Sequence, residues 1–104
     1  MKRGEVWWAA LPKPAGRRPV VLVSRDEAYQ VRELVIVVPV TTRVRELPTE
    51  VPLGRDEGMP RRCVANADAL TTIPKGTLVE YAGALSAERL GQLESAIRFA
   101  LGFE

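Results

Sequence analysis

The chain has 104 residues, of which 46% are hydrophobic and 27% are charged, so we expect one soluble globular domain that spans residues 1–104. It contains no histidine and a single cysteine, which excludes a Ser-His-Asp triad, a histidine-ligated metal site and an internal disulfide. No apolar run approaches the roughly 18 residues that a membrane span needs, and we expect a cytoplasmic protein.

The formal net charge of +2 is unevenly distributed along the chain. Residues 1–45 hold nine Lys or Arg against four Asp or Glu, whereas residues 46–104 hold six against nine. Basic side chains that gather on one face attract the phosphate groups of nucleic acids. Basic side chains also solvate ordinary loops, and the charge pattern alone does not choose between these two roles.

The first 40 residues predict three strands. Residues 6–11 (VWWAAL) are rich in residues that favour strands, and residues 19–24 (PVVLVS) form the continuous apolar run of a buried strand. Residues 34–40 (LVIVVPV) give the strongest strand signal, although Pro39 indicates an edge, a bulge or a strand end. The prolines and glycine of residues 12–16 predict a loop, and residues 26–33 read as a polar turn with a short helical turn.

The rest of the chain predicts shorter strands and one helix. Within a polar stretch at 41–62 we expect a short strand at 50–53, followed by strands at 63–67 and, as strands or turns, at 70–73 and 78–81. Ser86 is a suitable N-cap for a final helix that ends near Gly102. One face of that helix contains four apolar residues, namely Leu90, Leu93, Ile97 and Leu101. The fold class is therefore mainly β with a C-terminal α-helix, an architecture that has no fixed function.

Six segments resemble, in order and over nearly the whole chain, segments of the MazF/PemK toxin family. They are residues 3–8 (RGEVWW), 17–21 (RRPVV), 38–42 (VPVTT), 47–51 (LPTEV), 72–75 (TIPK) and 83–86 (GALS) with the following helix. The resemblance implies an SH3-like small β-barrel of the MazF/CcdB/Kid-like toxin fold, which forms a homodimer through a barrel face and the C-terminal helix.

The same resemblance implies a function. Members are ribosome-independent endoribonucleases that cut single-stranded RNA next to a short preferred sequence, without a metal or other cofactor. A cognate MazE-like antitoxin holds them inactive by covering the RNA groove with a disordered segment. No DNA is expected to bind the toxin alone, and 2′,3′-cyclic phosphate and 5′-OH ends are the expected products.

Two segments depart from the family pattern. Members commonly carry a loop of the form GSEQGxxRP, whereas residues 13–19 (KPAGRRP) are shorter and lack the Ser-Glu-Gln piece. Relatives often have Gln and Arg at the positions of Ala69 and Thr71. Both differences are expected to change the preferred cut site, and the shorter loop brings activity itself into question.

Three catalytic contributions are needed to cut RNA by internal transesterification. A proton must leave the 2′-hydroxyl, the five-coordinate phosphorus needs charge stabilisation, and the departing 5′-oxygen needs a proton. An arginine guanidinium group supplies the charge stabilisation, and a threonine hydroxyl donates a hydrogen bond to a phosphate oxygen. By resemblance, Arg18 is the catalytic arginine and Thr41 the catalytic threonine.

Further polar residues are candidates for RNA binding, namely Arg17, Thr42, Arg43, Arg45 and Asp68. The competing interpretation for the arginines is a solvated loop, and for Asp68 it is a turn-forming residue. Of the adjacent tryptophans 7 and 8, one is expected inside and one outside, where it stacks on a base or packs in the core or dimer. Cys63 is expected to be a small buried residue.

Three rival interpretations remain. A gyrase-poisoning toxin of the CcdB type shares the fold class but binds a protein and cuts no RNA. A non-catalytic RNA-binding barrel binds RNA and leaves it intact. A degenerate family member is inactive because of its shortened loop.

Overall fold

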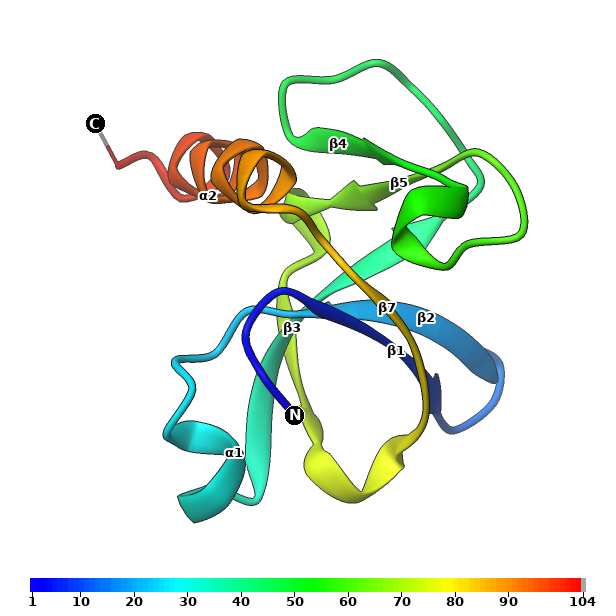
Figure 1. Ribbon diagram of the computed structural model, residues 1–104, viewed down its shortest axis with the longest axis vertical. Coiled ribbons are helices and arrows are strands. Elements are labelled where there is room, and N and C mark those ends of the chain that lie inside the picture. Colours follow the sequence, from blue (N-terminus) through cyan, green and yellow to red (C-terminus); the bar gives the residue numbers. More distant parts are fainter. Residues whose placement is uncertain (104) are drawn as a thin grey trace.

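The computed structural model describes residues 1–103 as a curled antiparallel sheet with one long helix packed against its end (Figure 1). The strands are β1 (Glu5–Ala10), β2 (Arg17–Leu22), β3 (Leu34–Thr41), β4 (Glu50–Leu53), β5 (Cys63–Asn66), β6 (Thr71–Pro74) and β7 (Leu78–Ala84). The α-helices are α1 (Ala28–Val31) and α2 (Ala87–Leu101), and single 3₁₀ turns form η1 (Arg55–Glu57), η2 (Ala67–Ala69) and η3 (Lys75–Thr77). The expected β architecture with a C-terminal helix is thus confirmed, as a half-barrel.

Strand β3 is the centre of the sheet. The strands follow the order β4-β5-β3-β2-β1-β7, and β6 also pairs with β3. One edge of β3 pairs with β2, while its other edge pairs first with β6, through residues 34–37, and then with β5, through residues 40–41. Pro39 lies in the gap between these two partners. The proline therefore marks neither a sheet edge nor a strand end but the point where β3 changes neighbours on one side.

Hydrophobic clusters cover both faces of the sheet. One cluster lies under α2 and contains Val21 and Leu93, and the other, near α1, contains Val20 and Leu22. Successive residues of a strand point to opposite faces, so β2 needs apolar residues at every position to contact both clusters. This is the physical reason for the continuous apolar run in residues 20–22.

Several element boundaries differ from expectation by a few residues. Strand β2 begins at Arg17, two residues before the predicted strand, because it pairs with β1 as far as Ala10. It ends at Leu22, and Ser24 instead accepts a hydrogen bond on Oγ from the Ile36 N–H at 2.7 Å. Strand β7 runs to Ala84 because β1 pairs with it over its whole length.

Helix α2 has the predicted caps but a narrower buried face. Ser86 Oγ accepts a hydrogen bond from the Arg89 N–H at 3.1 Å, and Gly102 ends the helix in the left-handed conformation. Leu93 is fully buried, whereas Leu101 is exposed. Ala96 and Ala100, rather than Leu101, complete the face of α2 that packs on the cluster beneath it. No helix within residues 1–103 is long and apolar enough to cross a membrane.

Candidate active site

The pairing of β2 with β3 brings the two predicted catalytic residues together. The last pair of residues between these strands joins Val20 to Pro39. Continuing the same register by two residues takes β2 back to Arg18 and β3 forward to Thr41. Because side chains repeat every two residues on one face of a strand, both side chains leave the sheet on one side. Both residues line one cleft, whose lining also includes Pro19 and Val40 from the opposite face of the two strands.

This cleft has a volume of about 310 Å³ and a mixed lining. Its polar and basic residues are Arg17, Arg18, Thr41, Thr42 and Arg61, and its other residues are Trp8, Pro19, Val40, Met59, Pro60 and Cys63. It therefore combines an apolar floor with a cationic rim. The basic residues suit an anionic group such as a phosphate, and the apolar residues suit a flat ring.

The Arg18 side chain is oriented by the short β1–β2 loop. Its Nε donates a hydrogen bond to the Ala15 carbonyl oxygen at 2.9 Å. The loop is closed by the Leu11 N–H, which donates to the Gly16 carbonyl oxygen at 3.0 Å. The terminal nitrogens of Arg18 form no hydrogen bond with any residue that the structure describes. The Arg18 guanidinium group is therefore held through Nε, while the N–H groups of Nη1 and Nη2 stay available to donate to a phosphate.

The Thr41 hydroxyl is held as an acceptor and remains a donor. Its Oγ1 accepts a hydrogen bond from the Arg43 N–H at 3.1 Å. A hydroxyl has one hydrogen and two lone pairs, so this contact leaves the hydrogen free. Thr41 can thus donate to an oxygen of a bound phosphate without losing its backbone contact.

Arg17 is engaged within the protein. It forms an ion pair with Glu80 of β7, and its guanidinium lies over the Trp8 ring, 5.1 Å from the centroid. Both partners are exposed, so the ion pair adds little stability. Its effect on the cleft is to offset one positive charge at the rim.

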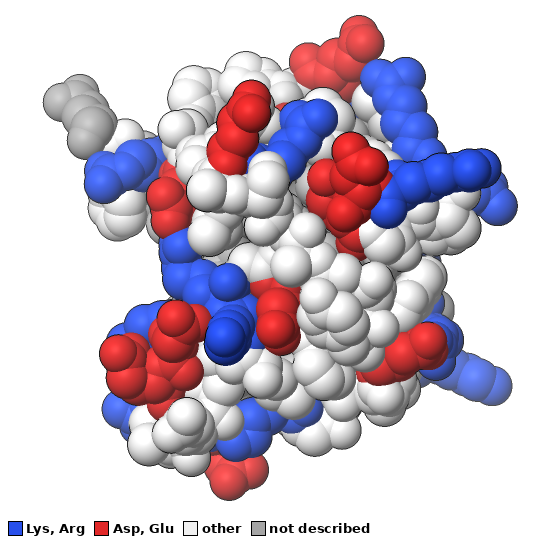
Figure 2. All heavy atoms as spheres, in the orientation of Figure 1, with Lys and Arg blue, Asp and Glu red and all other residues white. Residues whose placement is uncertain are grey.

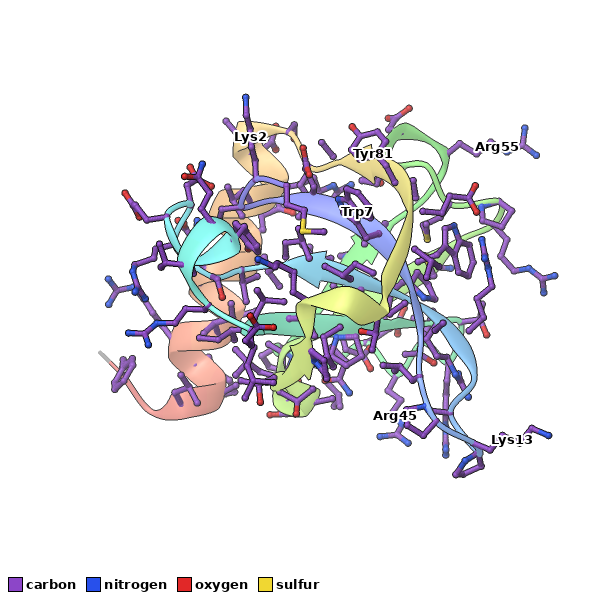
Figure 3. All side chains as sticks on the ribbon, turned by 90° about the horizontal axis from the view of Figure 1, so that it is seen from below. Lys2, Trp7, Lys13, Arg45, Arg55 and Tyr81 are labelled. Atoms are coloured by element: carbon purple, nitrogen blue, oxygen red, sulfur yellow. The ribbon has the colours of Figure 1, made fainter. Side chains whose placement is uncertain are left out.

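A second, smaller pocket adjoins the cleft at Thr41. Its volume is about 190 Å³, and it is lined by Pro39, Thr41, Arg43, Arg45, Glu50, Asn66 and Ala69. One Glu50 oxygen accepts hydrogen bonds from the Arg45 and Leu47 N–H groups at 2.9 and 3.5 Å. Figure 3 shows Arg45 at the same end of the molecule as Lys13, with both side chains projecting outward. Thr41 is the residue that the linings of the two pockets share.

Asp68 lies outside both linings and has a local role. Its carboxylate accepts a hydrogen bond from the Thr49 hydroxyl at 2.8 Å, and its N–H donates to the Asn66 side chain at 3.0 Å. Asp68 therefore stabilises the turn η2, and a turn-forming role is one of its two predicted roles. Base reading by Asp68 stays a prediction.

The two tryptophans occupy opposite faces of β1, and both are half-buried. Trp7 packs against the cluster near α1 and meets Tyr81 edge-to-face, with ring centroids 6.0 Å apart. Figure 3 labels both residues, which lie close together. Trp8 packs against the cluster under α2 and lines the cleft. Trp8 is therefore the tryptophan that can contact a base.

Acidic and basic side chains are mixed on the face shown in Figure 2, with long basic side chains projecting at its right edge. That edge holds the β1–β2 loop and η1 in Figure 1. Of the basic residues in 1–45, Arg17 and Arg18 line the cleft and Arg43 and Arg45 line the adjoining pocket. Arg3 lies elsewhere, where it pairs with Glu94 of α2. Among the described residues, no three Asp, Glu or Cys side chains are grouped as metal ligands.

The segment 54–62 supplies cleft residues that the sequence does not single out. Met59, Pro60 and Arg61 line the cleft, yet Arg61 is one of several arginines in a polar stretch and belongs to no recognised motif. Cys63, at the start of β5, is buried as predicted. Burial raises the pKa of its thiol, with a smaller contribution from Glu57, so it remains neutral and is no nucleophile.

Segment 54–62 closes the open side of the half-barrel. The buried Glu57 carboxylate accepts a hydrogen bond from the Gly54 N–H at 2.7 Å. Gly58 has a φ of +86° and lies against the backbone of β7, where an added Cβ would overlap the Ala82 carbonyl oxygen. Only a glycine fits this crossing, which ties the segment to β7 and positions Met59 and Arg61.

Comparison with known proteins identifies relatives along the whole length. The family model described as "PemK-like, MazF-like toxin of type II toxin-antitoxin system" matches residues 2–101. Probable endoribonuclease MazF5 of Mycobacterium tuberculosis is 39% identical over 101 residues, which cover 95% of this chain and 91% of that protein. Endoribonuclease MazF9 of the same species is 33% identical over 113 residues, covering 97% of this chain and 96% of that protein.

Solved structures give the same result. Mycobacterium tuberculosis toxin MazF-mt6 superposes with a TM-score of 0.89 at 32% identity, covering 96% of this chain and 98% of that chain. An endoribonuclease in complex with its cognate antitoxin, from a mycobacterial species, has a TM-score of 0.87 at 27% identity and covers 100% of this chain and 97% of that chain.

The tight contact at Gly58 gives a stability prediction. Gly58→Ala is expected to lower the free energy of unfolding by more than about 2 kcal/mol, because the methyl group strains the backbone and displaces segment 54–62. Gly76→Ala is the matched control, since a Cβ there meets no atom within 4 Å. Urea denaturation of both variants measures the difference. Equal unfolding midpoints would contradict the role given to this crossing.

Proposed function

Because the chain belongs to the PemK-like, MazF-like toxins of type II toxin–antitoxin systems, we propose that it is the toxin of such a pair and cuts single-stranded RNA. Its curated relatives are named endoribonucleases, and by this relationship the chain is an endoribonuclease. The observation that supports the proposed site is the single cleft lined by Arg18 and Thr41. We assign these two residues the catalytic roles.

The proposed reaction is an internal transesterification. The 2′-oxygen attacks the phosphorus and forms a P–O2′ bond while the P–O5′ bond breaks, so the products carry a 2′,3′-cyclic phosphate and a 5′-hydroxyl. The Arg18 terminal nitrogens donate to the non-bridging oxygens, whose negative charge grows in the transition state. The Thr41 hydroxyl donates to one of these oxygens and orients the phosphate.

Proton transfer is assigned to water. No carboxylate lines the cleft within residues 1–103, and an arginine, which stays protonated in proteins, is an ineffective base. We propose that the 2′-hydroxyl proton passes to solvent and that a water protonates the departing 5′-oxygen. Rate enhancement then comes mainly from charge stabilisation and orientation, without a metal ion, and the cleavage rate increases with pH.

The remaining predicted residues are proposed as RNA contacts. Thr42 lies in the catalytic cleft, and Arg43 and Arg45 lie in the adjoining pocket. Backbone phosphates on either side of Thr41 are their proposed partners. Arg17 is proposed as a contact that exchanges Glu80 for phosphate when RNA binds. Sequence preference follows from the pocket beside Thr41, where Asn66 and Ala69 lie.

Cleavage of a long RNA in the presence of EDTA is the central test. The wild-type protein is expected to cut at a recurring short sequence, and mapping of 5′ ends identifies it. Arg18→Ala is expected to lower the rate on the order of 10²-fold or more, because charge stabilisation is lost. Thr41→Val removes one hydrogen bond and is expected to lower the rate about tenfold.

Arg25→Ala is the control, since Arg25 is exposed and lies outside the cleft lining. Full activity of Arg18→Ala would disprove the catalytic assignment. RNA that is bound but remains intact would favour a non-catalytic RNA-binding barrel. Inhibition of DNA gyrase without RNA cleavage would favour a CcdB-type toxin.

An antitoxin is the second proposed partner. A solved relative is described as an endoribonuclease in complex with its cognate antitoxin. We propose that an acidic, partly disordered segment of a small protein covers the cleft of this chain, because a basic rim attracts acidic chains. Adding such a cognate protein in equimolar amount is expected to abolish RNA cleavage. If RNA cleavage were undiminished when the two proteins are mixed, the proposal of an antitoxin partner would be disproved.

A homodimer is proposed from the apolar end of the chain. Phe99, Leu101 and Phe103 are 63%, 52% and 62% exposed, an unusual concentration of large apolar side chains on one terminal segment. Sedimentation velocity is expected to show a dimer for the wild type and a shift toward monomer for Phe99→Ser. A monomeric wild-type protein at micromolar concentration would contradict this assembly.

A further inference from the structure

Arg61 stands in the catalytic cleft although no motif of the sequence points to it. It lines the same cavity as Arg18 and Thr41 but comes from segment 54–62, whereas those two residues come from β2 and β3. We propose that Arg61 is a second phosphate-binding arginine of this cleft, which grips the RNA backbone from a different wall than Arg18. The inference rests on the proposed ribonuclease function and adds a substrate-binding residue to it.

The position of Arg61 is determined by its neighbours in the chain. Met59 and Cys63, two residues before and two residues after, are each 3% exposed and belong to the cluster under α2. Gly58 packs against the backbone of β7, and the Glu57 carboxylate caps Gly54. An arginine between two buried anchors has a fixed backbone, so only its side chain must be ordered when a ligand binds.

The three arginines of the cleft differ in how many donors they have available. Arg17 is ion-paired with Glu80, and the Arg18 Nε donates a hydrogen bond to the Ala15 carbonyl oxygen. Arg61 forms neither a hydrogen bond nor an ion pair with any residue in the range 1–103. An arginine has five N–H donors, and in Arg61 all five are available to a ligand. It is therefore the cation of the cleft with the least competition from the protein.

The gathering of three arginines around one cavity is explained better by the binding of a polyanion than by solvent exposure alone. Of the three guanidinium groups around this cavity, that of Arg17 is offset by Glu80. Those of Arg18 and Arg61 have no carboxylate partner among the described residues, and they repel one another. Successive phosphates of a single strand supply the missing charge at spaced positions. Arg18 then holds the scissile phosphate at Thr41, and Arg61 holds a neighbouring one.

Arg62 provides a matched control at the next position. It has the same charge, is also exposed, and follows Arg61 directly in the chain. It lines a different pocket, together with Arg55 and Arg89, and not the catalytic cleft. General electrostatic attraction affects both residues alike, whereas a specific phosphate contact affects Arg61 alone.

The experiment compares Arg61→Ala, Arg61→Lys and Arg62→Ala with the wild type in the full-length protein. The cleaved substrate is a single-stranded RNA oligonucleotide that contains the mapped cut sequence. The binding probe is the same fluorescein-labelled oligonucleotide with a 2′-deoxynucleotide before the scissile phosphate, which prevents cleavage. Thermal melting of each variant verifies that it is folded.

Arg61→Ala is expected to raise KM and the probe Kd about tenfold while kcat changes less than about threefold, because a backbone phosphate contact contributes to binding in both the ground and transition states. The slope of log Kd against log salt, measured between about 50 and 200 mM, is expected to fall by about 0.7. Arg61→Lys is expected to keep most of that slope, and Arg62→Ala is expected to stay within about twofold of wild-type affinity.

Equal losses of affinity for Arg61→Ala and Arg62→Ala would overturn the inference in favour of general attraction. An unchanged Kd for Arg61→Ala, or a loss confined to kcat, would overturn it as well. The wild type separates these outcomes from a failure of the proposed function. If it cuts RNA while Arg61→Ala behaves like the wild type, only the inference fails; if it neither cuts nor binds RNA, both fail.

Discussion

The antiparallel pairing of β2 with β3 is the constraint on which the site depends. Valines of the two strands alternate between two hydrophobic clusters, so the pair is buried on both faces of the sheet. A slip of one residue would exchange the faces of every side chain, and burial on both sides resists such a slip. The register that hydrophobic packing establishes at Val20 and Pro39 places Arg18 near Thr41 two residues further on. Core packing thereby determines where the two predicted catalytic residues lie relative to each other.

The cleft owes its character to an apolar floor beneath a basic rim. Trp8, Val40 and Met59 give its base an apolar surface, and an apolar surface strengthens the attraction between opposite charges close to it. The rim arginines are not equivalent, because Glu80 and the Ala15 carbonyl each occupy donors of one of them. We therefore expect their contributions to RNA binding to differ, even though their formal charges are the same.

Closure of the half-barrel joins the site to the rest of the fold. Segment 54–62 bridges β7 and β5, and the contact of Gly58 with the β7 backbone holds it there. The same segment presents Met59 and Arg61 to the cleft. Any change that loosens this bridge opens the cleft and also weakens the cluster under α2, because Met59 belongs to both.

Local signals in the sequence determined the strands and the helix, and the family resemblance supplied the predicted catalytic pair. The apolar runs at 20–22 and 34–40, the Ser86 cap and Gly102 depend on nearby residues only, and the structure has each of them. The motif resemblance named the family and pointed to Arg18 and Thr41, which the structure brings into one cleft. Their catalytic roles remain predictions.

Only the tertiary structure decided which other side chains reach the cleft. Arg61 and Arg62 are identical neighbours in the sequence, yet they line different pockets because the chain crosses β7 at Gly58 before entering β5. The pairing of Arg17 with Glu80 joins residues that are 63 positions apart. Ala100 packs on the cluster under α2, whereas the neighbouring Leu101 is exposed. Contacts of this kind arise from long-range packing, which leaves no local periodicity or motif in the sequence.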